Sequence, residues 1–407
     1  MTEKSQKPIA RRAFLMGSAG GVLAASSGNF APALGLGPPT QWREDRRVLF
    51  ICVDGFGTDY LQQSDMPNLK RMIEAGTYVE GRGMIPSLTN VNNASILTAS
   101  FPEDHGITGN YYYDRNTGTG TFMESAEFLL LPTIFEKASD RGIKTAFVSS
   151  KEKLMFLSRG ADFAVAAERP TTEMLATIGP AQDVYSPDIN FWSFRAARHF
   201  LKEGGCQLVY LATTDYMMHT YPATDERSLA HLHTLDELLG QILNDHSNLE
   251  VYLTADHAMS PKRTAIDIGR ILTANSIEGE AVPIIRDRYI VHHRNLGGAC
   301  YVYLENEVDL EKTFELLRGV SGVEEIYHKQ EAVEEFQLHA DRIGDIFLLG
   351  EEHVVFGDLE RTREDVAIRS HGSRHETTIP IICYGTEVDA SLYRRNIDLT
   401  RNFVWGA

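Results

Sequence analysis

The stretch "RVLFICVD", residues 47–54, decides the fold class of this chain. It is a continuous run of apolar residues that ends on a carboxylate, Asp54. A strand with one face in water would alternate apolar and polar residues, whereas a parallel strand covered by helices on both faces is apolar throughout. We therefore predict a buried strand whose carboxyl end carries a functional group, because open α/β proteins bind ligands at that edge of the sheet.

Similar apolar runs alternate with helical patterns along the rest of the chain. This alternation predicts an α/β fold with a mostly parallel central sheet and helices on both faces. The further strands are expected at 144–150, 207–215, 249–257 and 379–385, and the main helices near 66–75, 190–204 and 225–246.

Residues 285–350 interrupt this rhythm. The segment "ACYVYLENEVDLEKTFELLRGVSGVEEIYH…GDIFLLG" has the pattern β-α-β-β. We expect a small α+β insertion that caps the main sheet. The catalytic core is then expected in two pieces, 46–284 and 351–407.

The composition limits the class of partner. The formal net charge is −17, and no basic stretch is interleaved with aromatic residues, so nucleic-acid binding is not expected. A protein this acidic can bind an anionic substrate only through local positive charge, such as metal ions, lysines or helix N-termini. The four cysteines show no disulfide or metal-binding pattern and are expected to be buried thiols.

The N-terminal segment predicts export. Residues 1–33 contain the pair Arg11-Arg12, a weakly apolar run and a small-residue end at Ala31-Pro-Ala33. This pattern is typical of a twin-arginine signal peptide, which predicts contact with that export machinery and a periplasmic or secreted protein. A disordered basic tail is the alternative. The apolar run is too short and too rich in glycine for a stable membrane span.

Acidic and imidazole side chains gather at the predicted strand ends. Carboxylates and imidazoles together suit zinc or a similar divalent ion. Each residue alone would more often be a turn or cap residue, but six of them at one edge are too many for one tetrahedral ion and suit two. The six are Asp54, Asp215, His219, Asp256, His257 and His371.

A candidate nucleophile lies in "IPSLTNVNNASILTAS", residues 85–100. This predicted helix begins with more hydroxyls and amides than one N-cap needs. A hydroxyl at a helix N-terminus beside two metal ions is placed to attack an anionic phosphoryl group, and metal coordination would lower its pKa. We choose Thr89 over Ser87 because Thr89 lies at the expected cap; an ordinary N-cap is the alternative.

These residues resemble a known family. The segments "VDGF", "MPNLKRM", "PSLTNVNNASILTASFPEDHGITGNYYYD", "TTDYMMHTY", "TADHAMSPK" and "SHG" are similar to motifs of the alkaline phosphatase superfamily, in its nucleotide pyrophosphatase/phosphodiesterase branch. The segments "TNVNNASI", "HGITGNYYYD", "SKEKL", "YIVHH" and "RIGDI" resemble most closely the phosphonoacetate hydrolase family. The resemblance runs from about residue 48 to the final strand.

The resemblance implies roles for individual residues. One zinc would be held by Asp215, His219 and His371, and the other by Asp54, Asp256, His257 and the Thr89 oxygen. Asn110 would donate a hydrogen bond to a phosphoryl oxygen, and Lys151 and Lys153 would bind the substrate carboxylate. From the sequence alone these lysines would be solvated, and their i, i+2 spacing in a strand-like segment would place both on one side of the strand. Ser100 departs from the family, which usually has glycine there, and this concerns a local turn rather than a ligand.

The expected activity is that of a di-zinc hydrolase acting on a small anionic phosphonate or phosphodiester. The first hypothesis is cleavage of the C–P bond of phosphonoacetate, to acetate and phosphate, through a phosphothreonine; the two lysines favour it. The second is a type I phosphodiesterase or nucleotide pyrophosphatase, which the export signal favours. The third is a non-catalytic exported metal-binding protein. A homodimer is compatible with the sequence.

Overall fold

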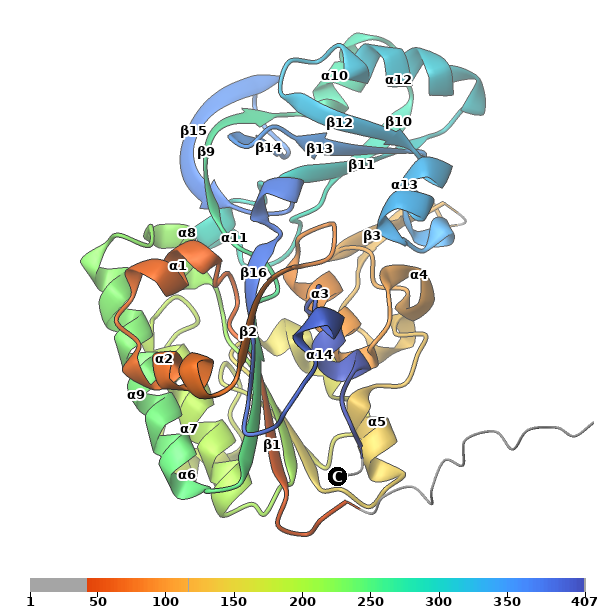
Figure 1. Cartoon of the computed structure of the whole chain (residues 1–407). Coiled ribbons are helices and arrows are strands. Elements are labelled where there is room, and N and C mark those ends of the chain that lie inside the picture. The colour runs from red at the N-terminus through yellow and green to blue at the C-terminus, as the bar shows by residue number, and fades with distance from the viewer. Residues whose placement is uncertain (1–41, 116, 406–407) are drawn as a thin grey trace, which may run out of the picture. The chain divides into compact units, whose positions relative to one another are not determined.

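A seven-stranded sheet forms the centre of the fold (Figure 1). The computed structural model describes residues 42–115 and 117–405, so the predicted signal segment 1–33 lies outside the described residues. All strands of this sheet run parallel except β16, which is antiparallel to both of its neighbours. In spatial order the strands are β2 (Thr77–Arg82), β16 (Thr378–Tyr384), β8 (Leu249–Thr254), β1 (Arg47–Cys52), β7 (Leu208–Ala212), β5 (Thr145–Ser149) and β6 (Phe163–Ala166).

Helices cover both faces of this sheet (Figure 1). The prediction of a mostly parallel sheet between two helical layers is therefore confirmed. The central strands β7 and β8 are buried along their whole length, which explains their continuous apolar sequences. One face carries α1 (Thr58–Gln63), α2 (Pro67–Ala75), α6 (Thr172–Ile178), α7 (Asp188–Lys202), α8 (Tyr216–Thr220) and α9 (Glu226–Asp245); the other carries α3 (Thr89–Thr98), α4 (Pro102–His105), α5 (Ile134–Ser139) and α14 (Asp398–Arg401).

Helix α3 is buried on every side, which accounts for the polar residues that the sequence places there. Asn92 Oδ1 accepts hydrogen bonds from the Met84 backbone N–H (2.7 Å) and from Asn396 Nδ2 (2.8 Å). Asn93 Oδ1 accepts one from the Tyr210 hydroxyl (2.8 Å). These amides therefore join α3 to its surroundings and do not cap it, because buried polar groups need partners.

The end of α3 shows that Ser100 is compatible with the turn. The left-handed backbone conformation falls on Ala99, with φ of 57°, and not on Ser100. The Ser100 hydroxyl instead hydrogen-bonds that of Thr98 at 2.7 Å.

Three smaller sheets lie beyond the strand ends of the main sheet (Figure 1). The antiparallel four-stranded sheet consists of β10 (Gly279–Pro283), β11 (Ala299–Leu304), β13 (Ile346–Gly350) and β12 (Val323–His328), accompanied by α10 (Ile268–Ala274), α12 (Leu310–Arg318) and α13 (Lys329–Phe336). The others are β14 (Val354–Phe356), β9 (Ser260–Ile266) and β15 (Arg363–Ser370), and the hairpin of β3 (Tyr111–Asp114) and β4 (Thr119–Phe122). Short helices are η1 (Ala126–Phe128), η2 (Glu152–Ser158), α11 (Ile290–His293), η3 (Glu307–Asp309), η4 (Ala340–Arg342), η5 (Arg374–Glu376) and η6 (Ala390–Leu392).

The four-stranded sheet occupies the region where we expected the insertion at 285–350. It begins earlier, at Gly279, and its pattern includes the additional helix α13. The division of the core into 46–284 and 351–407 stays a prediction. Among the described residues, no helix has the length and apolar character needed to cross a bilayer.

Candidate active site

The predicted metal ligands meet at the carboxyl edge of the main sheet. Asp54 follows β1, Asp215 precedes α8, and Asp256 and His257 follow β8. The turn after β1 is tight because Gly55 adopts φ of +74° and lies so close to Asp215 that a Cβ atom would be 3.1 Å from that of Asp215. The chain reversals after three neighbouring strands therefore place three carboxylates side by side.

The histidines complete three overlapping groups of possible metal ligands. In each group the ligand atoms lie within 4.8 Å of one another. One group coincides with part of the expected set, and the other two share Asp215. The groups are Asp54, Asp256 and His257; Asp215, His257 and His371; and Asp215, His219 and His292.

Backbone carbonyls orient the expected histidine ligands. The Nδ1 atoms of His219, His257 and His371 lie 2.7, 2.9 and 2.7 Å from the carbonyl oxygens of Arg369, Ala258 and Ser87. Each Nδ1 therefore carries the proton, and each Nε2 is left as a lone-pair donor toward the carboxylates. This arrangement is the one that a metal-binding imidazole requires.

The electrostatics of the cluster also favour bound cations. Burial, together with the charges of Asp215 and Asp256, raises the pKa of Asp54 to about 8. Burial also raises the pKa of Asp256 to about 6. Oxygen atoms Oδ1 of Asp54 and Oδ2 of Asp256 are buried without a hydrogen-bond partner. Buried carboxylates with orphaned oxygens are costly unless cations pair with them, so the residues present fit a divalent metal centre.

Thr89 is the first residue of α3, and Leu88 is the N-cap. The expectation that Thr89 caps the helix is thus off by one position, and its hydroxyl makes no capping hydrogen bond. It instead lies 3.5 Å from Nε2 of His257. The Ser87 hydroxyl is engaged twice, because it donates to the Ser373 carbonyl (2.7 Å) and accepts from the Gly372 N–H (3.0 Å).

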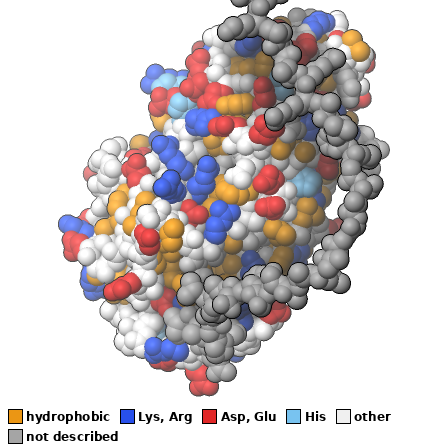
Figure 2. All heavy atoms as spheres, turned by 45° about the vertical axis from the view of Figure 1, so that its right-hand side comes forward, with side chains coloured by type: hydrophobic (Ala, Val, Ile, Leu, Met, Phe, Trp, Pro, Cys, Tyr) orange, Lys and Arg blue, Asp and Glu red, His pale blue; other side chains and the backbone are white. Residues whose placement is uncertain are grey.

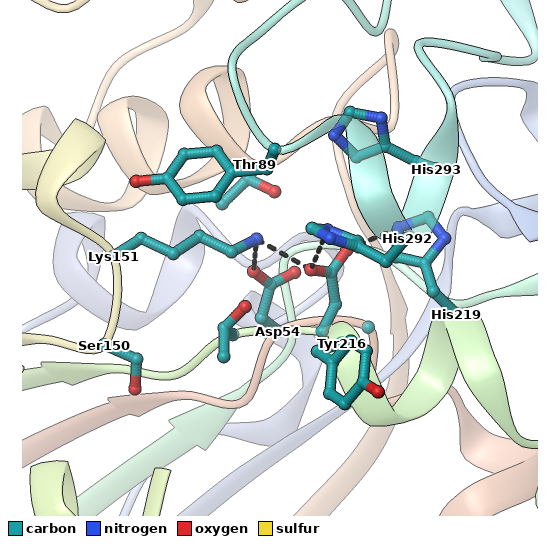
Figure 3. Close-up of polar contacts among 12 residues, drawn as sticks. Asp54, Thr89, Ser150, Lys151, Tyr216, His219, His292 and His293 are labelled. Carbon is teal, nitrogen blue, oxygen red and sulfur yellow. Dashed lines mark hydrogen bonds and ion pairs between the residues drawn. The ribbon is translucent and has the colours of Figure 1, made fainter. Parts of the chain in front are cut away.

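Lys151 extends into the centre of the ligand cluster (Figure 3). Its Nζ donates to Oδ2 of Asp54 (2.8 Å) and to Oδ1 of Asp215 (2.7 Å), and the residue is only 2% exposed. Burial alone would raise the pKa of Asp215, but Lys151 and His219 hold it well below its usual range. Lys151 is thus the internal counter-ion of the carboxylates.

The other two expected substrate contacts meet at a carboxylate that the sequence did not reveal. Asp287 Oδ2 accepts hydrogen bonds from Lys153 Nζ (2.6 Å) and from Asn110 Nδ2 (3.0 Å). Its Oδ1 accepts from the Tyr289 N–H (2.8 Å) and pairs with His293 Nε2 (2.9 Å). Lys153 is therefore neutralised within the protein. The two lysines do not lie on a strand, as we expected, but at the start of η2.

Sequence reasoning also missed the role of α11. Nε2 of His292 lies 3.7 Å from Oδ1 of Asp215, and its Nδ1 is buried without a partner. Figure 3 shows His292 facing the cluster from the side opposite to Lys151. The signal in the sequence is the adjacent pair of histidines in "YIVHH", for which the resemblance implies no role.

The profile of the family described as type I phosphodiesterase / nucleotide pyrophosphatase matches residues 48–374. This chain belongs to that family. The expected membership of the alkaline phosphatase superfamily is therefore confirmed, and the family supports a hydrolase.

Curated relatives are about 25% identical to this family member over the aligned residues. Bis(5'-adenosyl)-triphosphatase enpp4 of Mus musculus is 25% identical over 54% of this chain and 49% of its own length. Venom phosphodiesterase of Naja atra is 24% identical over 52% of this chain and 26% of its own length. The chain thus spans about half or less of these relatives.

Solved structures extend the likeness to nearly the whole fold. Phosphonoacetate hydrolase from Sinorhizobium meliloti, in complex with phosphonoacetate, superimposes with a TM-score of 0.81 at 30% identity, covering 88% of this chain and 95% of that chain. Murine ectonucleotide pyrophosphatase / phosphodiesterase 5 gives a TM-score of 0.65 at 16% identity, covering 87% and 93%, and shows the shared fold alone.

Proposed function

We propose that this protein is a di-zinc hydrolase that cleaves the C–P bond of phosphonoacetate, or of a close analogue, to give acetate and phosphate. The observation that carries the proposal is the burial of Lys151 against the expected metal ligands Asp54 and Asp215, with Lys153 buried two residues further along the chain. Likeness to the Sinorhizobium meliloti enzyme, whose structure contains phosphonoacetate, supports the same substrate.

Seven side chains would hold the metal ions. Bound ions would neutralise phosphoryl oxygens and lower the pKa of the threonine hydroxyl. One set is Asp54, Thr89, Asp256 and His257, and the other is Asp215, His219 and His371, with His292 as a further candidate beside Asp215.

Thr89 would be the nucleophile. Its oxygen forms a bond to phosphorus while the bond from phosphorus to carbon breaks, and the bonding electron pair passes to the departing carbon. Conjugation with the adjacent carboxylate spreads this charge as an enolate, which takes up, through water, the proton that the Thr89 hydroxyl has released, to give acetate. Hydrolysis of the phosphothreonine by a second water releases phosphate and restores the hydroxyl.

The lysines would stabilise the charge that develops on the leaving group. Lys151 now pairs with Asp54 and Asp215, which are expected metal ligands. Once cations neutralise these carboxylates, its ammonium becomes available to an anionic substrate. Asn110 would donate from its amide to a phosphoryl oxygen in place of Asp287.

A phosphodiesterase or nucleotide pyrophosphatase is the second candidate. The pairing of Lys153 with Asp287 favours it, because a neutralised lysine attracts a substrate carboxylate less strongly. In that case the leaving group is an alkoxide or a phosphate. It carries no carboxylate, so the reaction does not need an unpaired lysine beside the leaving group.

The experiment is a comparison of substrates with the zinc-loaded protein. Phosphonoacetate, a nitrophenyl phosphonate ester and a nucleotide diester are assayed side by side. Release of phosphate from phosphonoacetate supports the first candidate, whereas turnover of the diesters alone assigns the protein to the second. If the protein binds zinc but turns over none of the three substrates, the result supports the third hypothesis, a non-catalytic metal-binding protein.

We also propose export through the twin-arginine machinery. The basis is the Arg11-Arg12 signal pattern, which lies outside the described residues. A homodimer stays compatible with the sequence, and size-exclusion chromatography with light scattering measures it directly.

A further inference from the structure

A polar cavity lies outside the candidate active site. It has a volume of about 420 Å3, and its lining includes four arginines and no acidic residue. None of the expected metal ligands or substrate contacts lines it. The arginines are Arg82, Arg374, Arg394 and Arg395. Figure 2 shows several Lys and Arg side chains close together near the middle of the face that it draws, with others scattered toward its edges.

Backbone pairing forces these arginines together. The Arg82 N–H donates to the Arg394 carbonyl (3.0 Å), and the Asn396 N–H donates to the Arg82 carbonyl (3.1 Å). The Gly83 N–H donates to the Thr377 carbonyl (2.7 Å), which joins the segment that carries Arg374. The backbone segments that carry the four arginines are therefore joined directly to one another.

The positive charge of this arginine cavity is poorly balanced. Arg374 pairs with Glu325 through two contacts of 2.6 and 2.7 Å. In the described part of the chain, Arg82, Arg394 and Arg395 form no ion pair with a carboxylate. The nearby Asp398 does not supply one, because its Oδ2 accepts from the backbone N–H groups of Arg394 (2.9 Å) and Arg395 (2.8 Å).

Positive charges that line one cavity repel each other wherever water screens them only in part. Like charges held side by side repel each other, and the chain as a whole has a net charge of −17 with many carboxylates that could have been placed there. An oxyanion removes the repulsion, because guanidinium groups present paired N–H donors that match phosphate oxygens.

We propose that the arginine cavity binds a phosphate-bearing anion from solution. Arg82, Arg394 and Arg395, which lack a carboxylate partner among the described residues, supply the charge, and the cavity volume accommodates a phosphate ester as well as inorganic phosphate. Arg394 and Arg395 are exposed and make no side-chain hydrogen bond to the described protein, so their donors are free for the ligand.

The test is calorimetric titration of inorganic phosphate into the zinc-loaded protein and into Arg394→Gln. We expect two binding sites in the unchanged protein, one at the metal centre and one in the arginine cavity. In the variant, phosphate should no longer bind in the arginine cavity, or should bind there at least about tenfold more weakly. The kcat/KM of the reaction at the metal centre should stay unchanged. Arg361→Gln is the matched control, because Arg361 is also exposed but lines a pocket with acidic residues.

A thermal readout separates this proposal from the proposed function. Without phosphate, Arg394→Gln should melt no lower than the unchanged protein, because it relieves repulsion; with phosphate it should gain less stability. These results hold whichever substrate the metal centre accepts. Equal phosphate binding by Arg394→Gln, or an equal loss in Arg361→Gln, would overturn the proposal.

The source of the phosphate group is tested with vesicles. Cosedimentation with phosphatidylcholine vesicles is compared with and without phosphatidic acid. We expect no difference, because the proposed ligand is a soluble anion. Binding only to vesicles that contain phosphatidic acid, together with no binding of inorganic phosphate, would replace the soluble anion with a lipid headgroup.

Discussion

Thr89 carries a hydroxyl that the fold does not use for capping. In the described part of the chain its hydrogen-bond partner is Nε2 of His257, at 3.5 Å. We predict that Thr89→Ala folds and retains metal but loses turnover by roughly a thousandfold or more, because a covalent nucleophile has no substitute. Steady-state rates and metal analysis on the same preparation measure this.

Two variants control for this prediction. Thr89→Ser keeps a hydroxyl and should retain measurable turnover. Ser87→Ala should instead lower stability, because the Ser87 hydroxyl joins Ser373 and Gly372. Near-normal activity in Thr89→Ala would show that the nucleophile is a different group.

Lys151 is expected to act on the leaving group rather than on the phosphoryl group. We predict that Lys151→Ala lowers kcat/KM for phosphonoacetate by roughly a hundredfold or more, because the lost interaction strengthens as the enolate forms. A nitrophenyl phosphonate ester, which has no carboxylate, should lose much less. Kinetics of both substrates with one preparation give the comparison.

The same comparison for Lys153 needs a second substitution. Removing this lysine alone leaves the buried Asp287 carboxylate with His293 and neutral donors only, and the lost charge partner lowers stability by up to about 3–5 kcal/mol. The double variant Lys153→Met/Asp287→Asn avoids that charge and should fold. Equal losses on both substrates, in this variant and in Lys151→Ala, would mean that the lysines act on structure or on the phosphoryl group.

At the scale of elements, buried strands and their ends were the part of the fold that sequence patterns predicted. Continuous apolar runs locate β1, β7 and β8, because strands covered on both faces admit few polar residues. The residues that follow them are then brought together by parallel geometry alone. Asp287 was not predictable in this way, because it lies between β10 and α11, where no periodic pattern sets its direction.

Helix η2 is a part of the fold that the sequence pattern did not predict. The spacing of Lys151 and Lys153 indicated one side of a strand, yet tertiary packing places them at the start of a 3-10 helix, where both are buried. Local pattern cannot identify a buried lysine, since its burial depends on carboxylates from β1, β7 and the insertion.

The packing of α4 against α3 makes stability depend on pH. Burial lowers the pKa of His105 to about 3, and its Nε2 lies 2.8 Å from the Ser95 hydroxyl. The unfolded chain takes up this proton below about pH 6.5, whereas the folded chain does not until about pH 3. We predict that, as the pH decreases from about 6.5 to about 3, protonation of His105 in the unfolded chain lowers the free energy of unfolding by about 1.4 kcal/mol per pH unit.

Urea unfolding at several pH values measures the effect. His105→Gln keeps polar atoms at this position but has no group that titrates there, so its stability should fall less steeply below pH 6.5. His233, which is exposed, serves as the control through His233→Gln. Identical slopes for the unchanged protein and His105→Gln would contradict the prediction.

The strand ends should hold metal directly. His219 lies in α8 beyond β7, and Asp256 lies beyond β8. We predict that His219→Ala and Asp256→Ala each lower the amount of bound zinc as well as the reaction rate. A side chain that coordinates the metal directly holds the ion that the reaction needs. Elemental analysis of the purified variants decides the matter, and full zinc occupancy in both would show that the ligand assignment is wrong.

At the scale of the whole molecule, the expected ligands connect segments far apart in the sequence. They extend from Asp54 to His371 and come from the ends of β1, β7, β8 and β15, together with the start of α3. The residues between His257 and His371 include the four-stranded sheet. Bound cations would therefore hold together elements whose mutual contacts otherwise depend on packing.

We predict that removal of metal lowers the stability of the whole fold. Without cations, Lys151 pairs with Asp54 and Asp215 but not with Asp256, and one oxygen each of Asp54 and Asp256 has no hydrogen-bond partner in the described part of the chain. A ligand that binds only the folded state adds about 4 kcal/mol when present at a thousandfold excess over its Kd. We expect a chelator to lower the melting temperature by several degrees, and zinc to restore it.

The variant Asp256→Asn is the control for this prediction. The rise in melting temperature that zinc produces should be smaller in this variant. After chelation, the variant should melt no lower than the unchanged protein after chelation, because one buried charge is gone. An unchanged melting temperature after complete chelation would mean that the carboxylate cluster is stable by itself and that metal binding has no structural role.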